Sequence, residues 1–188
     1  MSTKLTLNFA YGSNIWMDQM KRRCPESRFI GVAKLEKWYG NSSPGLVAAV
    51  LTISTNHRRW IISTRGYANV IPSQEDYVYG FVYELNATDE SVLDGYEGVP
   101  VSYTKHTLSA ELTKGADGHE KYAYNKDGKT HIDIMVYVNT TDIQNGKIKD
   151  EYIFRMNQAM QDGLREGIPK DYLDKYLVPF ISAENAQP

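Results

Sequence analysis

Hydrophobic and polar residues alternate near the start of the chain, as they do in a β-strand with one buried face. In residues 4–11, Leu5, Leu7 and Phe9 fall on one side, and polar side chains fall on the other. Residues 77–85 show the clearest strand pattern, and the glycine in the middle of this segment indicates a bulge or a close backbone approach. The same reasoning predicts further strands over residues 29–38, 46–53, 60–64, 101–112 and 131–138.

Two short helices are predicted between these strands. The first covers residues 15–23 and follows three residues that favour turns and caps, at positions 12–14. The second begins at Thr88, an N-cap residue, and ends near Gly98. The side chains expected to face inward are Ile15, Trp16 and Met20 in the first helix and Val92, Leu93 and Tyr96 in the second.

The longest predicted helix covers residues 150–166, where hydrophobic residues recur three and four positions apart. Gly167 stands where a terminating glycine belongs, and Pro169 begins a short last helix. The inward faces are expected to hold Ile153, Met156, Met160 and Leu164 in the long helix and Leu173, Tyr176, Leu177 and Phe180 in the last one.

The order of these elements predicts the fold class. Strands dominate the first three quarters of the chain, and strands and helices do not alternate regularly as they do in a doubly wound sheet. We therefore expect an α+β fold in which a mixed, curled sheet packs against a few helices. The 188 residues contain no linker and no repeat, which predicts one domain over residues 1–188.

Composition and charge narrow the classes of partner. The net charge of −2 is spread over both signs, so no basic patch indicates a nucleic-acid partner. No hydrophobic run approaches the roughly 20 residues that span a bilayer, so we expect no membrane partner. One cysteine, Cys24, excludes an internal disulfide, and the N-terminus lacks the pattern of a signal peptide. These features predict a cytoplasmic protein.

The common catalytic and cofactor motifs are absent from the sequence. His57, His106, His119 and His131 occur at no metal-ligand spacing. The chain has no glycine-rich nucleotide-binding motif and no G-x-S-x-G sequence. We therefore expect neither a metal nor a cofactor.

Two segments remain as candidates for chemistry. In residues 9–14 a buried strand runs into a turn of small residues, whose outward backbone N–H groups can hold an anion; an ordinary strand–turn–helix junction fits equally well. Glu97 lies at a helix end amid hydrophobic residues, where limited hydration raises the pKa of a carboxyl and suits it to acid/base catalysis. A solvated glutamate at a helix end is the alternative, and Asp94, one turn earlier, either neighbours Glu97 or faces water.

These two segments belong to a series of motifs that resembles those of the γ-glutamylcyclotransferase family. A fungal-type member of this family is one of the identities that the resemblance leaves open. The motifs follow the family's order and cover about residues 7–180. They are FAYGSN at residues 9–14, GYANV at 66–70, VYGFVY at 78–83, LDGYEGV at 93–99 and GIPKDY at 167–172.

The resemblance implies a small mixed β-barrel with a pocket at its mouth and Glu97 as the catalytic acid/base. It implies a small γ-glutamyl substrate that is converted to 5-oxoproline by attack of its own α-amine, without a cofactor. The γ-glutamyl group would be received chiefly by backbone amides of the turn. The implied substrate-binding residues are Asn8, Phe9, Ala10, Tyr11, Gly12, Ser13, Asn14, Tyr103 and Tyr152, with Tyr137 as a further candidate for the pocket wall.

Several segments depart from the family's pattern, namely residues 58–60, 100–102 and 113–129. Because of these departures, the sequence does not identify the amine that is released. A γ-glutamyl amino acid or peptide is the expected substrate, and a bulky glutathione-derived conjugate of secondary metabolism is the alternative. A non-catalytic module that binds γ-glutamyl ligands is the alternative from another class. Monomer and homodimer also stay open.

Overall fold

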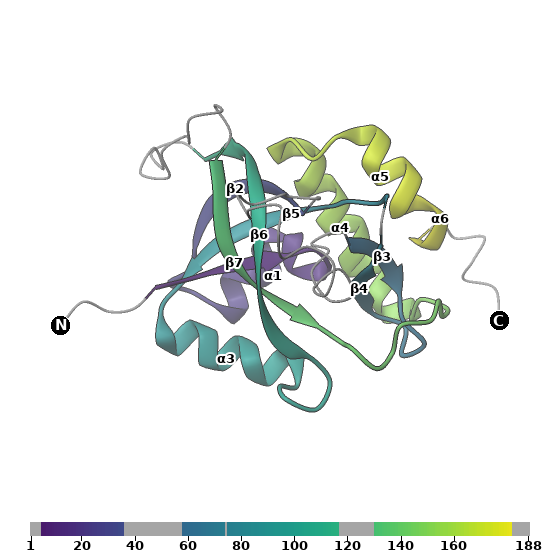
Figure 1. Ribbon diagram of the computed structural model, residues 1–188, viewed down its shortest axis with the longest axis horizontal. Coiled ribbons are helices and arrows are strands. Elements are labelled where there is room, and N and C mark those ends of the chain that lie inside the picture. The colour runs from purple at the N-terminus through teal and green to yellow at the C-terminus, as the bar shows by residue number, and fades with distance from the viewer. Residues whose placement is uncertain (1–4, 36–57, 74, 117–129, 182–188) are drawn as a thin grey trace, which may run out of the picture.

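The computed structural model describes residues 5–35, 58–73, 75–116 and 130–181 (Figure 1). The elements in chain order are β1 (Thr6–Ala10), the 3₁₀ turn η1 (Ser13–Ile15), α1 (Met17–Arg23), β2 (Arg28–Leu35), β3 (Arg58–Ile62), β4 (Ala68–Pro72), β5 (Val78–Leu85), α3 (Ala87–Glu97), β6 (Thr104–Gly115), β7 (Thr130–Val138), α4 (Asp150–Glu166), α5 (Lys170–Tyr176) and α6 (Val178–Ile181).

Five strands form a closed barrel in the order β1-β5-β2-β6-β7. The barrel closes where β1 pairs with β7 in parallel, with Asn8 opposite Met135, while the other neighbours in the barrel are antiparallel. Strands β3 and β4 form a separate antiparallel pair. In Figure 1, α3 lies along one end of the barrel, and α4, α5 and α6 lie on the side of the β3–β4 pair. The predicted α+β class with a mixed, curled sheet is confirmed.

The prediction of a single buried face on the first strand is wrong. Leu5 is 46% exposed, whereas Asn8, on the face expected to be polar, is 1% exposed. The reason is that α3 covers this face: the hydroxyl of Thr6, two residues before Asn8, donates a 2.6 Å hydrogen bond to Glu90 of the helix. A barrel strand that is covered by a helix has two buried faces, so the alternation in its sequence does not identify an exposed face.

The glycine at the centre of β5 allows a close backbone approach, as the sequence indicated. A Cβ atom at Gly80 would overlap the carbonyl oxygen of Ala10 and would lie 2.7 Å from the ring of Phe9. Only a residue without a side chain lets β5 pack this closely against β1. This close contact with β5 holds the end of β1, where the turn begins.

Helix α3 begins and faces differently from the prediction. Its N-cap is Asn86, not Thr88, because the Asn86 side chain accepts a 2.8 Å hydrogen bond from the amide of Asp89. Leu93 is buried as expected, but Val92 is 44% and Tyr96 is 59% exposed. The helix ends as predicted at Gly98, which has the left-handed backbone conformation (φ 66°) that favours glycine.

The first helical segment is split into two pieces. The 3₁₀ turn η1 comes first, and α1 starts only at Met17. Ile15 and Met20 are buried as predicted, whereas Trp16 is only partly buried. The turn therefore holds the chain between β1 and α1 in a tight, fixed conformation.

The bounds of α4 agree with the prediction, and Gly167 ends it with a left-handed conformation (φ 110°). Its buried face is rotated from the expected one, since Leu164 is 51% exposed. The buried residues on α4 are Tyr152, Met156, Ala159, Asp162 and Gly163. In the last helices, Leu173, Tyr176 and Leu177 are buried as predicted, and Tyr172 joins them.

Some predicted segments lie outside the described residues, including the strand over residues 46–53 and most of the 113–129 segment. Strand β4 was not predicted from the hydrophobic pattern. Within the described ranges, no helix is long and apolar enough to cross a membrane.

Candidate active site

A cavity of about 250 Å³ opens where the chain leaves β1. The structure brings all the sequence-predicted site residues to this one cavity, from elements as far apart as β1, α3 and α4. They are Asn8, Phe9, Ala10, Tyr11, Gly12, Ser13, Asn14, Glu97, Tyr103, Tyr137 and Tyr152.

The turn after β1 is held by two backbone hydrogen bonds, from Ile15 to Gly12 and from Trp16 to Ser13, each 3.0 Å. The amide of Ser13 donates to the hydroxyl of Tyr152 over 3.1 Å, so this N–H group is already occupied. Among the described residues, no group accepts a hydrogen bond from the amide of Gly12. A Cβ atom at Gly12 would lie 2.7 Å from the Tyr152 hydroxyl, so only glycine fits here without displacement.

Glu97 is the last residue of α3, and its carboxylate accepts a 2.9 Å hydrogen bond from the side-chain amide of Asn14. The amide of Asn14 is itself fixed, because its oxygen accepts from Gln19 at 3.0 Å and from Arg23 at 2.9 Å. Gln19 also donates to the hydroxyl of Ser13. The turn, the first helix and the carboxylate thus form one hydrogen-bonded unit.

Burial raises the pKa of Glu97 above the ordinary value of a glutamate. The positive charge of Arg23, the hydrogen bond from Asn14 and the charge of Arg155 act in the opposite direction but do not cancel this effect. A carboxyl with a raised pKa can accept and return a proton closer to neutral pH than an exposed glutamate can. The arrangement is therefore suited to acid/base chemistry.

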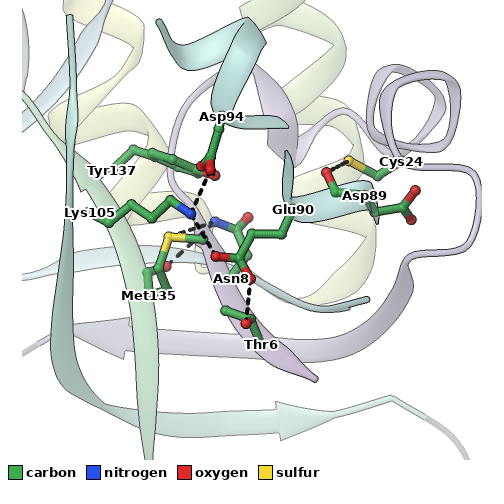
Figure 2. A network of polar contacts seen from close by, with 9 residues as sticks. All are labelled: Thr6, Asn8, Cys24, Asp89, Glu90, Asp94, Lys105, Met135 and Tyr137. Carbon is green, nitrogen blue, oxygen red and sulfur yellow. Dashed lines mark hydrogen bonds and ion pairs between the residues drawn. The ribbon is translucent and has the colours of Figure 1, made fainter. Parts of the chain in front are cut away.

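The side chain of Asp94 is 28% exposed, and among the described residues its partners are Tyr137 and Lys105, not Glu97. It accepts a 2.7 Å hydrogen bond from the hydroxyl of Tyr137 and forms a 2.7 Å ion pair with Lys105 (Figure 2). Lys105 also pairs with Glu90 at 2.6 Å, and Glu90 accepts from Thr6 of β1. This network, made of Thr6, Glu90, Asp94, Lys105 and Tyr137, joins α3 to three strands of the barrel. It fixes the helix that carries Glu97.

Three further tyrosines line the cavity with their hydroxyl groups already bonded. Tyr11 donates to the carbonyl of Tyr137 at 2.7 Å, and Tyr103 donates to the carbonyl of Ala68 at 2.9 Å. Tyr152 accepts from the turn, as described above. Burial raises the pKa of all three phenols, so they stay protonated near neutral pH. They can shape the cavity and offer hydrogen bonds but do not act as bases.

Sequence reasoning missed five residues that line the cavity: Arg23, Tyr67, Ala68, Tyr96 and Arg155. Arg155 follows Tyr152 by three positions on α4, so helical spacing alone places both on one face. The same spacing gives no reason to choose this face as a site. Arg23 stands at the end of α1, where basic residues are common for reasons of helix stability.

Within the described part of the chain, no group of three or more His, Cys, Asp or Glu side chains could hold a metal ion. His106 and His131 lie on β6 and β7, away from the cavity lining, and His57 and His119 lie outside the described residues.

Residues 9–152 match the protein family described as gamma-glutamyl cyclotransferase, AIG2-like. The chain belongs to this family. Curated relatives of this chain include the gamma-glutamylcyclotransferases of Homo sapiens and Bos taurus, each 33% identical over 96 residues. These 96 residues are 50% of this chain and 44% of each relative, so the match spans less than half the length of the relatives.

Solved structures of the γ-glutamyl cyclotransferase family share the fold. A gamma-glutamyl cyclotransferase superimposes with a TM-score of 0.64 at 19% identity, covering 92% of this chain and 86% of the other. A yeast cyclotransferase described as specific to glutathione superimposes with a TM-score of 0.56 at 16% identity, covering 96% and 95%. Identities this low establish a common barrel architecture and no more.

Proposed function

We propose that this protein is a γ-glutamylcyclotransferase, which converts a γ-glutamyl amino acid or peptide to 5-oxoproline and the free amine. The observation that carries the proposal is the partly buried carboxyl of Glu97, bonded to Asn14 on the turn and facing the cavity. Family membership and distant homology to γ-glutamylcyclotransferases support the same reaction.

The proposed reaction uses Glu97 as both base and acid. Glu97 takes a proton from the α-ammonium group of the substrate, and the freed amine attacks the γ-carbonyl carbon to form the new C–N bond of a five-membered lactam. The bond from this carbon to the leaving nitrogen then breaks. Glu97 returns this first proton to the leaving nitrogen. It then takes the second proton from the ring nitrogen, which still carries one too many after the attack, and passes it to the released amine. The lactam is then neutral, the leaving group departs as an ammonium and the carboxylate of Glu97 is regenerated.

This chemistry needs little beyond orientation and one proton carrier. Nucleophile and electrophile are in one molecule, and a well-oriented intramolecular reaction reaches effective molarities of roughly 10⁵–10⁸ M. One positioned acid/base contributes about 10²–10⁴-fold. The amide of Gly12 is available to stabilise a carboxylate or an oxyanion, while the buried tyrosines restrict the shape of the bound chain.

The experiment measures release of 5-oxoproline by the purified protein from γ-glutamyl dipeptides, glutathione and a glutathione S-conjugate. Glu97→Gln is expected to lower kcat by about 10²–10⁴-fold while KM changes little. Glu166→Gln is the matched control, because Glu166 ends α4 before a left-handed glycine just as Glu97 ends α3.

The outcomes separate the alternatives. Release by wild type and by Glu166→Gln, but not by Glu97→Gln, supports both the reaction and the role of Glu97. Near-native turnover by Glu97→Gln contradicts that role. Binding of γ-glutamyl compounds without release of 5-oxoproline identifies a binding module instead of an enzyme.

A further inference from the structure

The positive and negative charges of the residues that line the cavity are unequal in number. The lining contains one carboxylate, Glu97, and two guanidinium groups, Arg23 and Arg155. The two cations lie close enough to repel each other, since Arg155 contributes, after burial, to the lowered pKa of Arg23. The lining residues alone therefore carry an excess of one positive charge, which Glu151 offsets from outside the lining by its ion pair with Arg155. A ligand carboxylate that replaced Glu151 as the partner of Arg155 would restore this balance, so the cavity favours a ligand with an excess of one negative charge.

Arg23 is already engaged in the hydrogen-bonded unit that orients Glu97. It donates to the side-chain oxygen of Asn14 at 2.9 Å, and its guanidinium lies 4.5 Å from the ring centre of Tyr96. Moving Arg23 toward a ligand would release Asn14 from one of its two donors. Its charge thus acts beside Glu97, at the end of the cavity where the substrate's α-carbon must lie.

Arg155 contacts two aromatic rings and one acidic side chain, and its own side chain is 21% exposed. Its guanidinium lies over the ring of Tyr152, 4.8 Å from the centre, and 6.0 Å from the ring centre of Tyr67. Among the described residues, its polar partner is Glu151, which forms a 2.8 Å ion pair with it and has a side chain that is 59% exposed. A surface ion pair of this kind contributes little to stability, and a guanidinium has five N–H donors in a planar fork that matches a carboxylate.

We propose that Arg155 pairs with the carboxylate of the leaving amino acid and thereby selects γ-glutamyl compounds whose leaving amine carries a negative charge. This inference rests on the proposed function. A γ-glutamyl compound with a neutral leaving group has one ammonium and one carboxylate and no net charge. A leaving amino acid adds a second carboxylate, and the net charge of −1 then matches the cavity.

The order of groups in the substrate assigns the two arginines. Glu97 must meet the α-amine, so the neighbouring α-carboxylate lies near the turn and Arg23. The leaving group extends away from this end. Arg155, on α4 beside Tyr67, is then left for the second carboxylate, with which its planar fork can form two parallel hydrogen bonds.

The test compares kcat/KM for γ-glutamyl-L-alanine and γ-glutamyl-L-alaninamide, which differ only in the charge of the leaving group. Wild type is expected to prefer the acid, and Arg155→Met is expected to reduce the acid-to-amide ratio by about 10- to 100-fold, the range for a hydrogen bond to a charged group. Arg155→Lys, which keeps the charge but loses the planar fork, should fall between the two.

Arg22→Met is the matched control. Arg22 has the same kind of i, i+4 ion pair, with Asp18 at 3.0 Å, and lies over an aromatic ring, Trp16, at 4.6 Å, but it does not line the cavity. Its acid-to-amide ratio should equal that of wild type. An unchanged ratio in Arg155→Met, or equal use of acid and amide by wild type, overturns this inference and leaves the proposed reaction standing. Release of 5-oxoproline from neither compound by wild type overturns both.

Discussion

The side-chain amide of Asn14 donates a 2.9 Å hydrogen bond to the carboxylate of Glu97, across 83 positions of sequence. Because Gln19 and Arg23 both donate to the oxygen of the same amide, the nitrogen must point toward Glu97. This bond favours the ionised form of Glu97 and opposes the effect of burial on its pKa. Asn14 is thus placed to set the pH at which Glu97 can accept a proton.

Asn14→Asp is therefore expected to move the acid limb of the pH profile upward. A second carboxylate beside Glu97 favours a shared proton and raises the pKa of the pair further. The expected result is a shift of the acid limb of kcat/KM by about one pH unit or more. Asn157→Asp, which adds the same charge on α4 outside the cavity lining, is the control. An identical profile for Asn14→Asp and wild type would show that Asn14 does not act on Glu97.

Replacement of Glu97 should stabilise the fold while it removes activity. Burial raises the pKa of Glu97 in the folded state. Between the ordinary carboxyl pKa and this raised value, the folded state binds more protons than the unfolded state, so the free energy of unfolding falls as the pH rises. Glu97→Gln removes this penalty. Its Tm should exceed that of wild type at pH 8, and the difference should shrink toward pH 4.

Calorimetry from pH 4 to pH 8 checks this expectation, with Glu166→Gln reporting the effect of the same substitution outside the cavity. A gain in stability with a loss of turnover is the behaviour of a group kept for function at a cost to the fold. A Glu97→Gln protein that is less stable than wild type at pH 8 would contradict the assigned direction of the pKa shift.

Local patterns predicted most elements of the fold, and the misses have identifiable causes. Strand β4 contains Ala68, Asn69 and Pro72, residue types that are depleted in strands. Asn69 is held there by side-chain hydrogen bonds to the carbonyls of Asn139 and Asp142 at 2.8 and 3.0 Å. A local hydrophobic pattern contains no information about contacts between residues about 70 positions apart. Here these contacts outweigh the low strand propensity of the segment.

The candidate site, like the fold, contains residues that local sequence could predict and residues that it could not. The turn and Glu97 could be chosen because each combines an unusual local sequence with a chemical reason. Arg155 could not, because its importance comes from facing the same cavity as Glu97, a relationship between α4 and α3 that only the folded chain contains. The exposure of Tyr96 was also unpredictable, since helical spacing does not say which side of α3 meets the barrel.

Gly12 should tolerate no side chain, because of crowding and not because of backbone strain. Its φ of −117° is open to any residue, but a Cβ atom would lie 2.7 Å from the hydroxyl of Tyr152 and 3.0 Å from the Cβ of Ala68. Gly12→Ala is expected to lower the free energy of unfolding by about 1–3 kcal/mol and to raise KM. Chemical denaturation and steady-state kinetics measure the two effects.

Two further variants test the cause. Tyr152→Phe removes the crowded hydroxyl, so the double variant with Gly12→Ala should lose less stability than the sum of the two single changes. Gly95→Ala is the control: a Cβ there meets no atom within 4 Å, and it should stabilise α3 by about 0.4–1 kcal/mol. Additive losses in the double variant would show that the Tyr152 hydroxyl is not the obstacle.

Lys105 should connect the stability of α3 to catalysis. Burial acts to lower the pKa of Lys105, but its contacts with Asp94 and Glu90 outweigh burial and raise it. A raised pKa means that its stabilising effect is fully present below the ordinary lysine pKa and is lost only as the pH rises through the raised value. At pH 7, Lys105→Met leaves two carboxylates facing each other without a cation and should cost about 1–2 kcal/mol.

The same change should also lower kcat, because Asp94 lies one turn before Glu97 on the helix that the network holds. Lys170→Met is the matched control, since Lys170 pairs with a single exposed acid, Asp174, at the start of α5. It should change neither Tm nor kcat appreciably. If Lys105→Met lowers Tm and leaves kcat unaltered, the network stabilises the barrel without positioning Glu97. If Lys105→Met lowers both, recovery of both values in Lys105→Arg would establish that α3 requires a cation at this position.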